Sequence, residues 1–118
     1  MHIKKGILIN PTNETISECL IDTTKGLEDY YKHLECGTFD IAHIGDGHDV
    51  YIDDEGLLNI DHDTRFFSIE GYYQPLAGNG IVMGFDNETG DSIDCTLTID
   101  EVKARVKFHT LAEVQRMF

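Results

Sequence analysis

Residues 80–85, with the sequence Gly-Ile-Val-Met-Gly-Phe, are apolar throughout. A short apolar run of this kind is typical of a strand that is covered on both faces, and such a strand lies in the interior of a sheet. Residues 87–90, Asn-Glu-Thr-Gly, are turn formers, and Ser92–Cys95 follows them. The sequence therefore predicts a central strand at 80–85 that continues through a hairpin turn into a further strand.

Upstream of this strand, short apolar or alternating segments are separated by Gly, Asn and Asp residues. Ile7–Ile9 and Thr15–Ile21 flank the turn formers of residues 10–13, so we expect a hairpin there. Further strands are expected at 39–44 and 50–52, because apolar residues alternate in both segments.

One helix is expected between these strands, over about Lys25–Glu35. Its apolar residues fall on one stripe, as they do in a helix that packs against a core. Thr23 or Thr24 can cap its start, and Gly37 is a stop signal just beyond its end.

The C-terminal third predicts short strands and two short helices. Residues 66–69 are expected to form a short strand or a helical turn, and residues 106–108 follow the first helix as a further short segment. Thr98–Glu101 and Thr110–Glu113 have the spacing of a capping box, in which the threonine hydroxyl and the glutamate carboxylate satisfy backbone amides reciprocally. The first of these helices should end near Ala104. Short strands that do not alternate strictly with helices favour an α+β fold, with a mainly antiparallel sheet of five to seven strands and two or three helices.

The chain has 118 residues, which fits a single domain, with the C-terminal helix at about 110–117. It contains no apolar tract long enough for a membrane span, and its N-terminal apolar stretch is too short for a signal peptide. We therefore expect a protein that stays in the cytoplasm where it is made. Three widely spaced cysteines without a CxxC motif agree with reduced thiols in that compartment.

Charge is the outstanding property of the sequence. Twenty-two acidic residues and nine basic ones give a formal net charge of -13. Between Lys32 and Lys103 there are sixteen acidic residues and one base, Arg65. Such a field repels nucleic acid and anionic lipid and attracts a basic protein or a cation. We therefore expect no direct nucleic-acid or membrane binding.

Several segments resemble a small family of uncharacterised proteins, a domain of unknown function that is frequent in phage and plasmid genomes. The resemblance spans about residues 7–108 and is carried by Leu27–Tyr31, Phe39–Ile41, Val50–Gly56 and Pro75–Asp86. It implies a small accessory protein of a phage or other mobile element that acts inside a bacterial cell. It assigns no catalytic residue.

The segment His43–Asp49 is the strongest candidate for a small-ligand or divalent-metal site. Imidazole and carboxylate groups are common ligands of transition metals, and a hairpin could bring its two ends together. Gly-flanked His and Asp are also ordinary turn residues, so we expect no metal and no cofactor, and metal or ligand binding is the alternative. The weak candidates are His43, Asp46, His48 and Asp49.

Two other motifs are better explained as loops. Asn59, Asp61, Asp63 and Glu70 have the spacing of calcium-loop ligands, but Thr64 stands where that loop requires glycine. Gly78–Gly80 resembles a phosphate loop, but it lacks the Lys-Ser/Thr pair and precedes a strand. No nucleophile or metalloprotease motif is present, so we expect a protein that is not an enzyme.

The leading hypothesis is an accessory or inhibitory protein that binds a basic host or phage protein, for instance one that handles nucleic acid. Carboxylates can compete for the Lys and Arg side chains that normally grip phosphates. A monomer and a homodimer are both compatible with the sequence. The acidic residues expected at the contact are Asp40, Asp46, Asp49, Asp53, Asp54, Glu55, Asp61 and Asp63.

Overall fold

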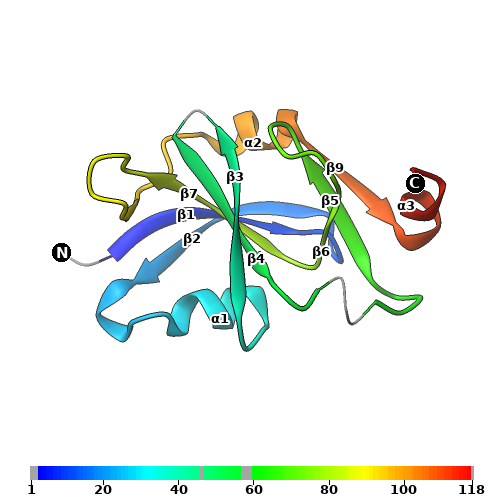
Figure 1. The fold of residues 1–118 in the computed structure, drawn as a ribbon, viewed down its shortest axis with the longest axis horizontal. Coiled ribbons are helices and arrows are strands. Elements are labelled where there is room, and N and C mark those ends of the chain that lie inside the picture. The colour runs from blue at the N-terminus through cyan, green and yellow to red at the C-terminus, as the bar shows by residue number, and fades with distance from the viewer. Residues whose placement is uncertain (1–2, 46, 57–59, 118) are drawn as a thin grey trace.

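A computed structural model describes residues 3–45, 47–56 and 60–117 (Figure 1). Within these ranges the chain forms three α-helices and nine strands, which confirms the α+β class. The strands form two antiparallel sheets, of six and three strands, where the sequence predicted one sheet of five to seven. None of the helices in the described ranges has the length and apolarity needed to cross a membrane.

The larger sheet is built around the predicted central strand. β7 pairs with β1 on one side and with β4 on the other, and the short β8 pairs with its C-terminal end. In order across the sheet, the strands are β2 (Thr15–Asp22), β1 (Ile3–Asn10), β7 (Gly80–Phe85), β4 (His48–Asp53) and β3 (Phe39–Gly45), with β8 (Ser92–Ile93) beside β7.

β7 is apolar because both of its faces are covered. Val82 packs into one core cluster, while Ile81 and Met83 pack into another on the opposite face. Position 80 also requires glycine for a steric reason, because a Cβ there would lie 2.6 Å from the ring of Phe67. Successive side chains of a strand point to opposite faces of the sheet. Because both faces of β7 are covered, no position of this strand faces water, and none is occupied by a polar residue.

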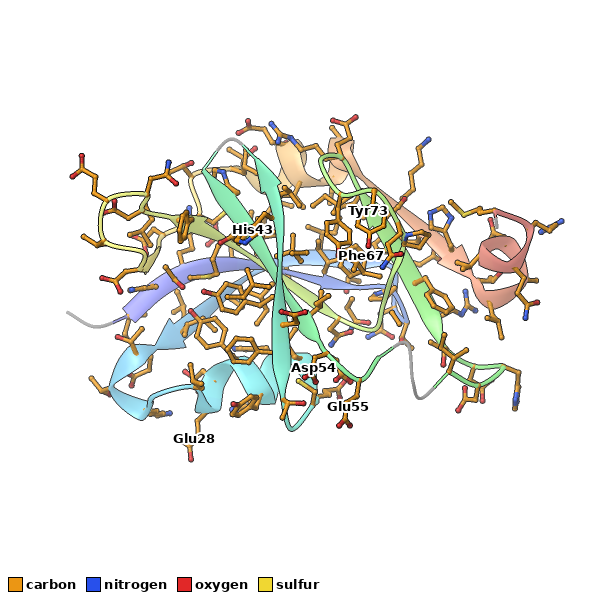
Figure 2. All side chains as sticks on the ribbon, in the orientation of Figure 1. Glu28, His43, Asp54, Glu55, Phe67 and Tyr73 are labelled. Carbon is orange, nitrogen blue, oxygen red and sulfur yellow. The ribbon has the colours of Figure 1, made fainter. Side chains whose placement is uncertain are left out.

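The smaller sheet covers one face of the larger sheet. It consists of β6 (Leu76–Ala77), β5 (Arg65–Ile69) and β9 (Val106–Thr110), in that order. Phe67 lies in the interior between the two sheets (Figure 2), and it is fully buried. Val102 of α2 (Ile99–Arg105) completes this core. We call this side of the larger sheet the small-sheet face.

The helix α1 (Glu28–Leu34) covers the other side, which we call the α1 face. Tyr30 stacks on Tyr51 of β4 with 4.7 Å between ring centroids, and Leu34 is buried in the same cluster. Burial of these side chains, rather than helix propensity, stabilises so short a helix.

The limits of α1 differ from the predicted helix over 25–35. Residues Thr23–Lys25 form a separate 3₁₀ turn, which the carboxylate of Asp22 caps by accepting from the backbone N–H of Thr24. Neither threonine caps the α-helix. At the other end the left-handed residue is Glu35 and not the predicted stop signal Gly37.

Both predicted capping boxes are present. Thr98 and Glu101 exchange hydrogen bonds of 3.1 Å at the start of α2. Thr110 and Glu113 do the same at the start of α3 (Leu111–Met117), which packs beside β9 and β5. A capping box depends only on residues within one turn, which explains why the sequence predicted it correctly.

Candidate functional site

A hollow of about 210 Å³ lies where the end of α1, the end of β4 and the loop between β6 and β7 meet. We call it the edge pocket. Its lining exposes polar and apolar atoms in similar proportion, and it comes from five separate segments of the sequence. The lining residues are Thr12, Leu34, Glu35, Asp53, Gly56, Thr64, Ala77, Gly78 and Asn79.

Hydrogen bonds hold the walls of the edge pocket. Asn79 is buried, and its Nδ2 donates to the carbonyl oxygen of His33 over 3.0 Å, which ties the β6–β7 loop to α1. Asp53 Oδ1 accepts the backbone N–H of Glu55, and Gly56 N–H donates to the Asp53 carbonyl. These bonds close the turn after β4 and fix the position of the Asp53 carboxylate.

Glu35 reaches the pocket through an unusual backbone conformation. It has φ of 55° and follows the last residue of α1, where proteins usually place glycine. A left-handed conformation costs an L-residue about 1–2 kcal/mol. The placement of Glu35 was missed because Gly37 was the only helix-stop signal in the local sequence.

We predict that Glu35→Gly stabilises the protein. Relief of the left-handed strain should outweigh the greater chain entropy of unfolded glycine, for a net gain of about 0.5–1 kcal/mol in the free energy of unfolding. Urea unfolding followed by circular dichroism measures the difference. The matched control is Glu28→Gly in the first turn of α1, which should destabilise; a loss of stability in both variants would contradict the account.

Further carboxylates surround the pocket on the same edge of the molecule. Asp54 and Glu55 are exposed and lie together to the right of the end of α1 (Figure 2). Asp61 and Asp63 belong to a turn that is tied to the pocket, because the Asp61 N–H donates to the hydroxyl of Thr64 over 3.0 Å. We call this set the acidic edge, and it comprises Glu35, Asp53, Asp54, Glu55, Asp61 and Asp63.

Lysine and arginine do not neutralise most of this edge. Lys25 pairs with Asp29 at the start of α1, away from this edge. Asp63 lies 3.4 Å from a nitrogen of His62, and both side chains are exposed. Lys32 and Arg65, which flank the edge in sequence, make no ion pair with Asp53, Asp54 or Asp61 in residues 3–45, 47–56 and 60–117.

The structure does not bring all eight expected acidic residues onto one face. Asp40 is paired with Ile52 on the small-sheet face, near Tyr72, and so lies away from the edge. Asp49 is buried on the α1 face and cannot contact a partner directly. Asp46 lies outside the described residues. The other five, Asp53, Asp54, Glu55, Asp61 and Asp63, belong to the acidic edge.

In the described part of the His43–Asp49 segment, one histidine and one aspartate form a pair, and no metal-binding cluster is present there. His43 Nδ1 and Asp49 Oδ1 are 2.7 Å apart, with the imidazole exposed and the carboxylate buried. His48 points to the opposite face of β4, where its Nε2 accepts the backbone N–H of Thr96. Within the described ranges, which omit Asp46, His, Cys, Asp and Glu side chains do not gather in threes as a metal ion requires.

The segment with the spacing of calcium-loop ligands forms a turn at Asp61–Thr64. Asp61 Oδ1 accepts the backbone N–H of Asp63 over 2.9 Å, and the Asp61 carbonyl accepts the N–H of Thr64. Asn59 lies outside the described residues. The described part of this segment is therefore an Asx turn that carries Asp61 and Asp63 outward.

The three cysteines are free thiols, as the sequence predicted. Cys19 and Cys95 are buried and Cys36 is half-buried. Burial raises the pKa of the Cys19 thiol to about 11, and burial followed by the charge of Asp53 raises the pKa of Cys36. A thiol with a raised pKa is protonated at neutral pH, so these residues are poor nucleophiles.

We predict a loss of stability at alkaline pH that depends on Cys19. The unfolded thiol ionises near its ordinary pKa, while the folded thiol stays protonated to about 11. The stability that the protonated Cys19 thiol contributes is therefore fully present below pH of about 9. It declines by roughly 2–3 kcal/mol as the pH rises to about 11. Urea unfolding at pH of about 8 and 10.5 measures it. Cys19→Ala should lose less stability over this interval than the wild type, and an equal loss would contradict the assignment.

Comparison with known proteins identifies one match. The family described as "Domain of unknown function (DUF3846)" matches residues 3–107. Neither a curated protein nor a solved structure matches the chain. The matched span agrees with the resemblance expected over about 7–108 and includes every residue of the edge pocket. The helix α3 lies beyond it.

Proposed function

Because the chain belongs to the DUF3846 family, a domain of unknown function, we propose its function from its own geometry: it binds a basic protein through the acidic edge. The observation that carries the proposal is the gathering of six carboxylates around one pocket, with Asp53, Asp54 and Asp61 free of lysine and arginine ion pairs in the described ranges. A surface of this kind is complementary to a patch of Lys and Arg.

The distribution of charge supports one docking side. Lys103 and Arg105 lie on α2, at the top of Figure 1, together with Asp100 and Glu101, whereas the described part of the segment between the end of β4 and the start of β5 lies in the lower half, to the right of α1. The acidic edge therefore lies away from the bases of α2, while Lys32 and Arg65 are the bases nearest to it in the sequence. A partner with a basic patch is attracted most strongly to the side with the excess of carboxylates, which orients its approach and speeds association.

The partner class follows from the same chemistry. Basic patches on proteins commonly serve to hold the phosphates of nucleic acid. A folded protein that presents exposed carboxylates can occupy such a patch and block it. We therefore propose a non-enzymatic, inhibitory role toward a nucleic-acid-handling protein of a bacterial host or of a phage, in the bacterial cytoplasm.

The test is affinity capture from a bacterial lysate with two matched variants, followed by mass spectrometry. Each substitution of an acid by lysine changes the net charge by two units, so three change -13 by six units to -7 in both variants. The edge triple variant alters acids outside the lining of the pocket, and the control triple variant alters exposed acids on β2 and in the β7–β8 loop. The edge triple variant is Asp54→Lys, Glu55→Lys and Asp63→Lys; the control is Glu18→Lys, Glu88→Lys and Asp91→Lys.

The proposal expects a basic protein that the wild type and the control triple variant capture and the edge triple variant does not. Capture should weaken as salt is added, because exposed charges are screened. A partner retained equally by both triple variants would place the contact elsewhere, and the proposal would fail.

A further inference from the structure

We propose that the edge pocket receives one arginine side chain of the basic partner. This inference rests on the proposed function and deepens it, because it names the group that the acidic edge recognises. Size, acceptor chemistry and rigidity of the pocket each support it.

The volume of the pocket suits one side chain. A hollow of about 210 Å³ has room for several water-sized groups and therefore for one long side chain. Pockets for nucleotides and other cofactors usually measure about 300–1,000 Å³. The edge pocket is therefore too small for a cofactor and larger than the cage of a bare metal ion.

The lining offers acceptors that need a donor. Asn79 is 8% exposed, and its Nδ2 is committed to His33, which fixes the orientation of the amide. Among the described residues, Asn79 Oδ1 has no hydrogen-bond partner. Every side-chain N or O atom that is fully buried in the described residues does have a partner, so Oδ1 is not fully buried. Oδ1 is therefore reachable, and the pocket that Asn79 lines is the route to it.

Two carboxylates complete the set of acceptors. Asp53 uses Oδ1 for the turn amide of Glu55, and within the described residues its Oδ2 has no hydrogen-bond partner. Glu35 is exposed, and in the same part of the chain its side chain makes no ion pair. Two negative groups and one neutral amide oxygen therefore face a space that contains no cation of the described chain.

Among cations, guanidinium fits this arrangement best. It has five N–H donors in a rigid planar fork, so it can bond to several separated acceptors at once, and it gives up its hydration more readily than ammonium. A lysine ammonium can reach fewer of the acceptors. A divalent ion needs its ligands within about 2.0–2.6 Å of one point, which is a closer convergence than a hollow of 210 Å³ provides.

The pocket is also preorganised. Gly78 has φ of 81°, and its N–H donates to the carbonyl of Arg65 over 3.0 Å, so the β6–β7 loop is fixed to the smaller sheet. Gly56 packs so closely that a Cβ would lie 3.0 Å from the Ala77 carbonyl oxygen. A rigid pocket saves the ordering cost of binding, which favours a specific anchor over diffuse attraction.

The experiment is a titration of the full-length, ¹⁵N-labelled protein with the peptide acetyl-Gly-Arg-Gly-amide, followed by amide chemical shifts. The expected result is saturable shifts that centre on the pocket lining. The same peptide with citrulline, which has the shape of arginine without its charge, should give no saturable shift. The lysine peptide should bind at least about threefold more weakly.

Two pairs of variants locate the binding. Asp53→Asn should weaken the arginine peptide at least about tenfold, since a hydrogen bond to a charged group is lost, while Asp63→Asn outside the pocket should not. Thr12→Trp should fill the pocket without a change in charge and abolish binding. Asn13→Trp, the next residue of the same exposed turn, should leave binding intact.

The outcomes separate this inference from the proposed function. If Thr12→Trp binds the arginine peptide like the wild type, or if calcium or magnesium produces the same saturable shifts, the arginine pocket is wrong. Loss of partner capture in the edge triple variant, whose substitutions spare the pocket lining, would then still uphold the proposed function. Conversely, the arginine peptide could bind the pocket as expected while the edge triple variant still captures its partner. The arginine pocket would then be upheld, and the proposed docking of the partner on the acidic edge would be wrong.

Discussion

Gly71→Ala is expected to lower the free energy of unfolding by at least about 3 kcal/mol. Gly71 has φ of 98°, and an added Cβ would overlap the backbone carbonyl oxygen of Ile44 and lie 2.9 Å from its carbonyl carbon. The neighbour is backbone of an edge strand, so it cannot rotate away as a side chain can. Strain in φ and overpacking therefore add, and a loss of this size is a large part of the stability of a small domain.

Gly90→Ala is the matched control. Gly90 has φ of 78°, but an added Cβ would meet no described atom within 4 Å, so only the backbone strain remains and about 1 kcal/mol should be lost. Urea unfolding followed by circular dichroism measures both variants. Equal losses would show that the loop at Gly71 moves away from Ile44 and that the close approach does not restrict the fold.

The sequence predicted those parts of the fold that depend on local chemistry. The strand at 80–85 was recognisable because apolar residues occupy both of its faces, and the hairpin of β1 and β2 because turn formers separate two short segments. The capping boxes at Thr98 and Thr110 need only residues three positions apart. In each case the signal and the structure span the same few residues.

The smaller sheet was not predictable in this way. It pairs Phe67 of β5 with Phe108 of β9, and nothing in either segment specifies the other as its partner. Two apolar strands of similar length could equally have extended the larger sheet. Long-range pairing is decided by packing of the whole chain, to which a local pattern gives no access.

The candidate site was predicted in part. Asp54 and Glu55 follow the end of β4, and Asp61 and Asp63 lie in the turn before β5; turns place such residues outside. Asp49 was misplaced because it lies inside β4, where successive side chains alternate between faces; the same rule separates it from His48, and it could have been applied to the sequence. The edge pocket itself, formed by five separate segments, left no local signal.

The largest expected effect on binding is that of the edge triple variant. An exposed charge pair contributes about 0.7 kcal/mol, so three such pairs contribute about 2 kcal/mol, or about thirtyfold in affinity, before the repulsion by the new lysines is added. The control triple variant has the same net charge and should lose no more than about threefold in affinity, because its lysines replace acids on β2 and in the β7–β8 loop, outside the proposed contact. The difference between the two should shrink as salt is added.

The most direct test of the acidic edge is the affinity of a fluorescent oligo-arginine peptide for the two triple variants, measured by anisotropy at one ionic strength and neutral pH. The edge triple variant should bind about tenfold or more weakly than the control triple variant, by the same charge-pair arithmetic. Equal affinities would show that the peptide responds only to net charge, and the acidic edge would then have no special role in binding.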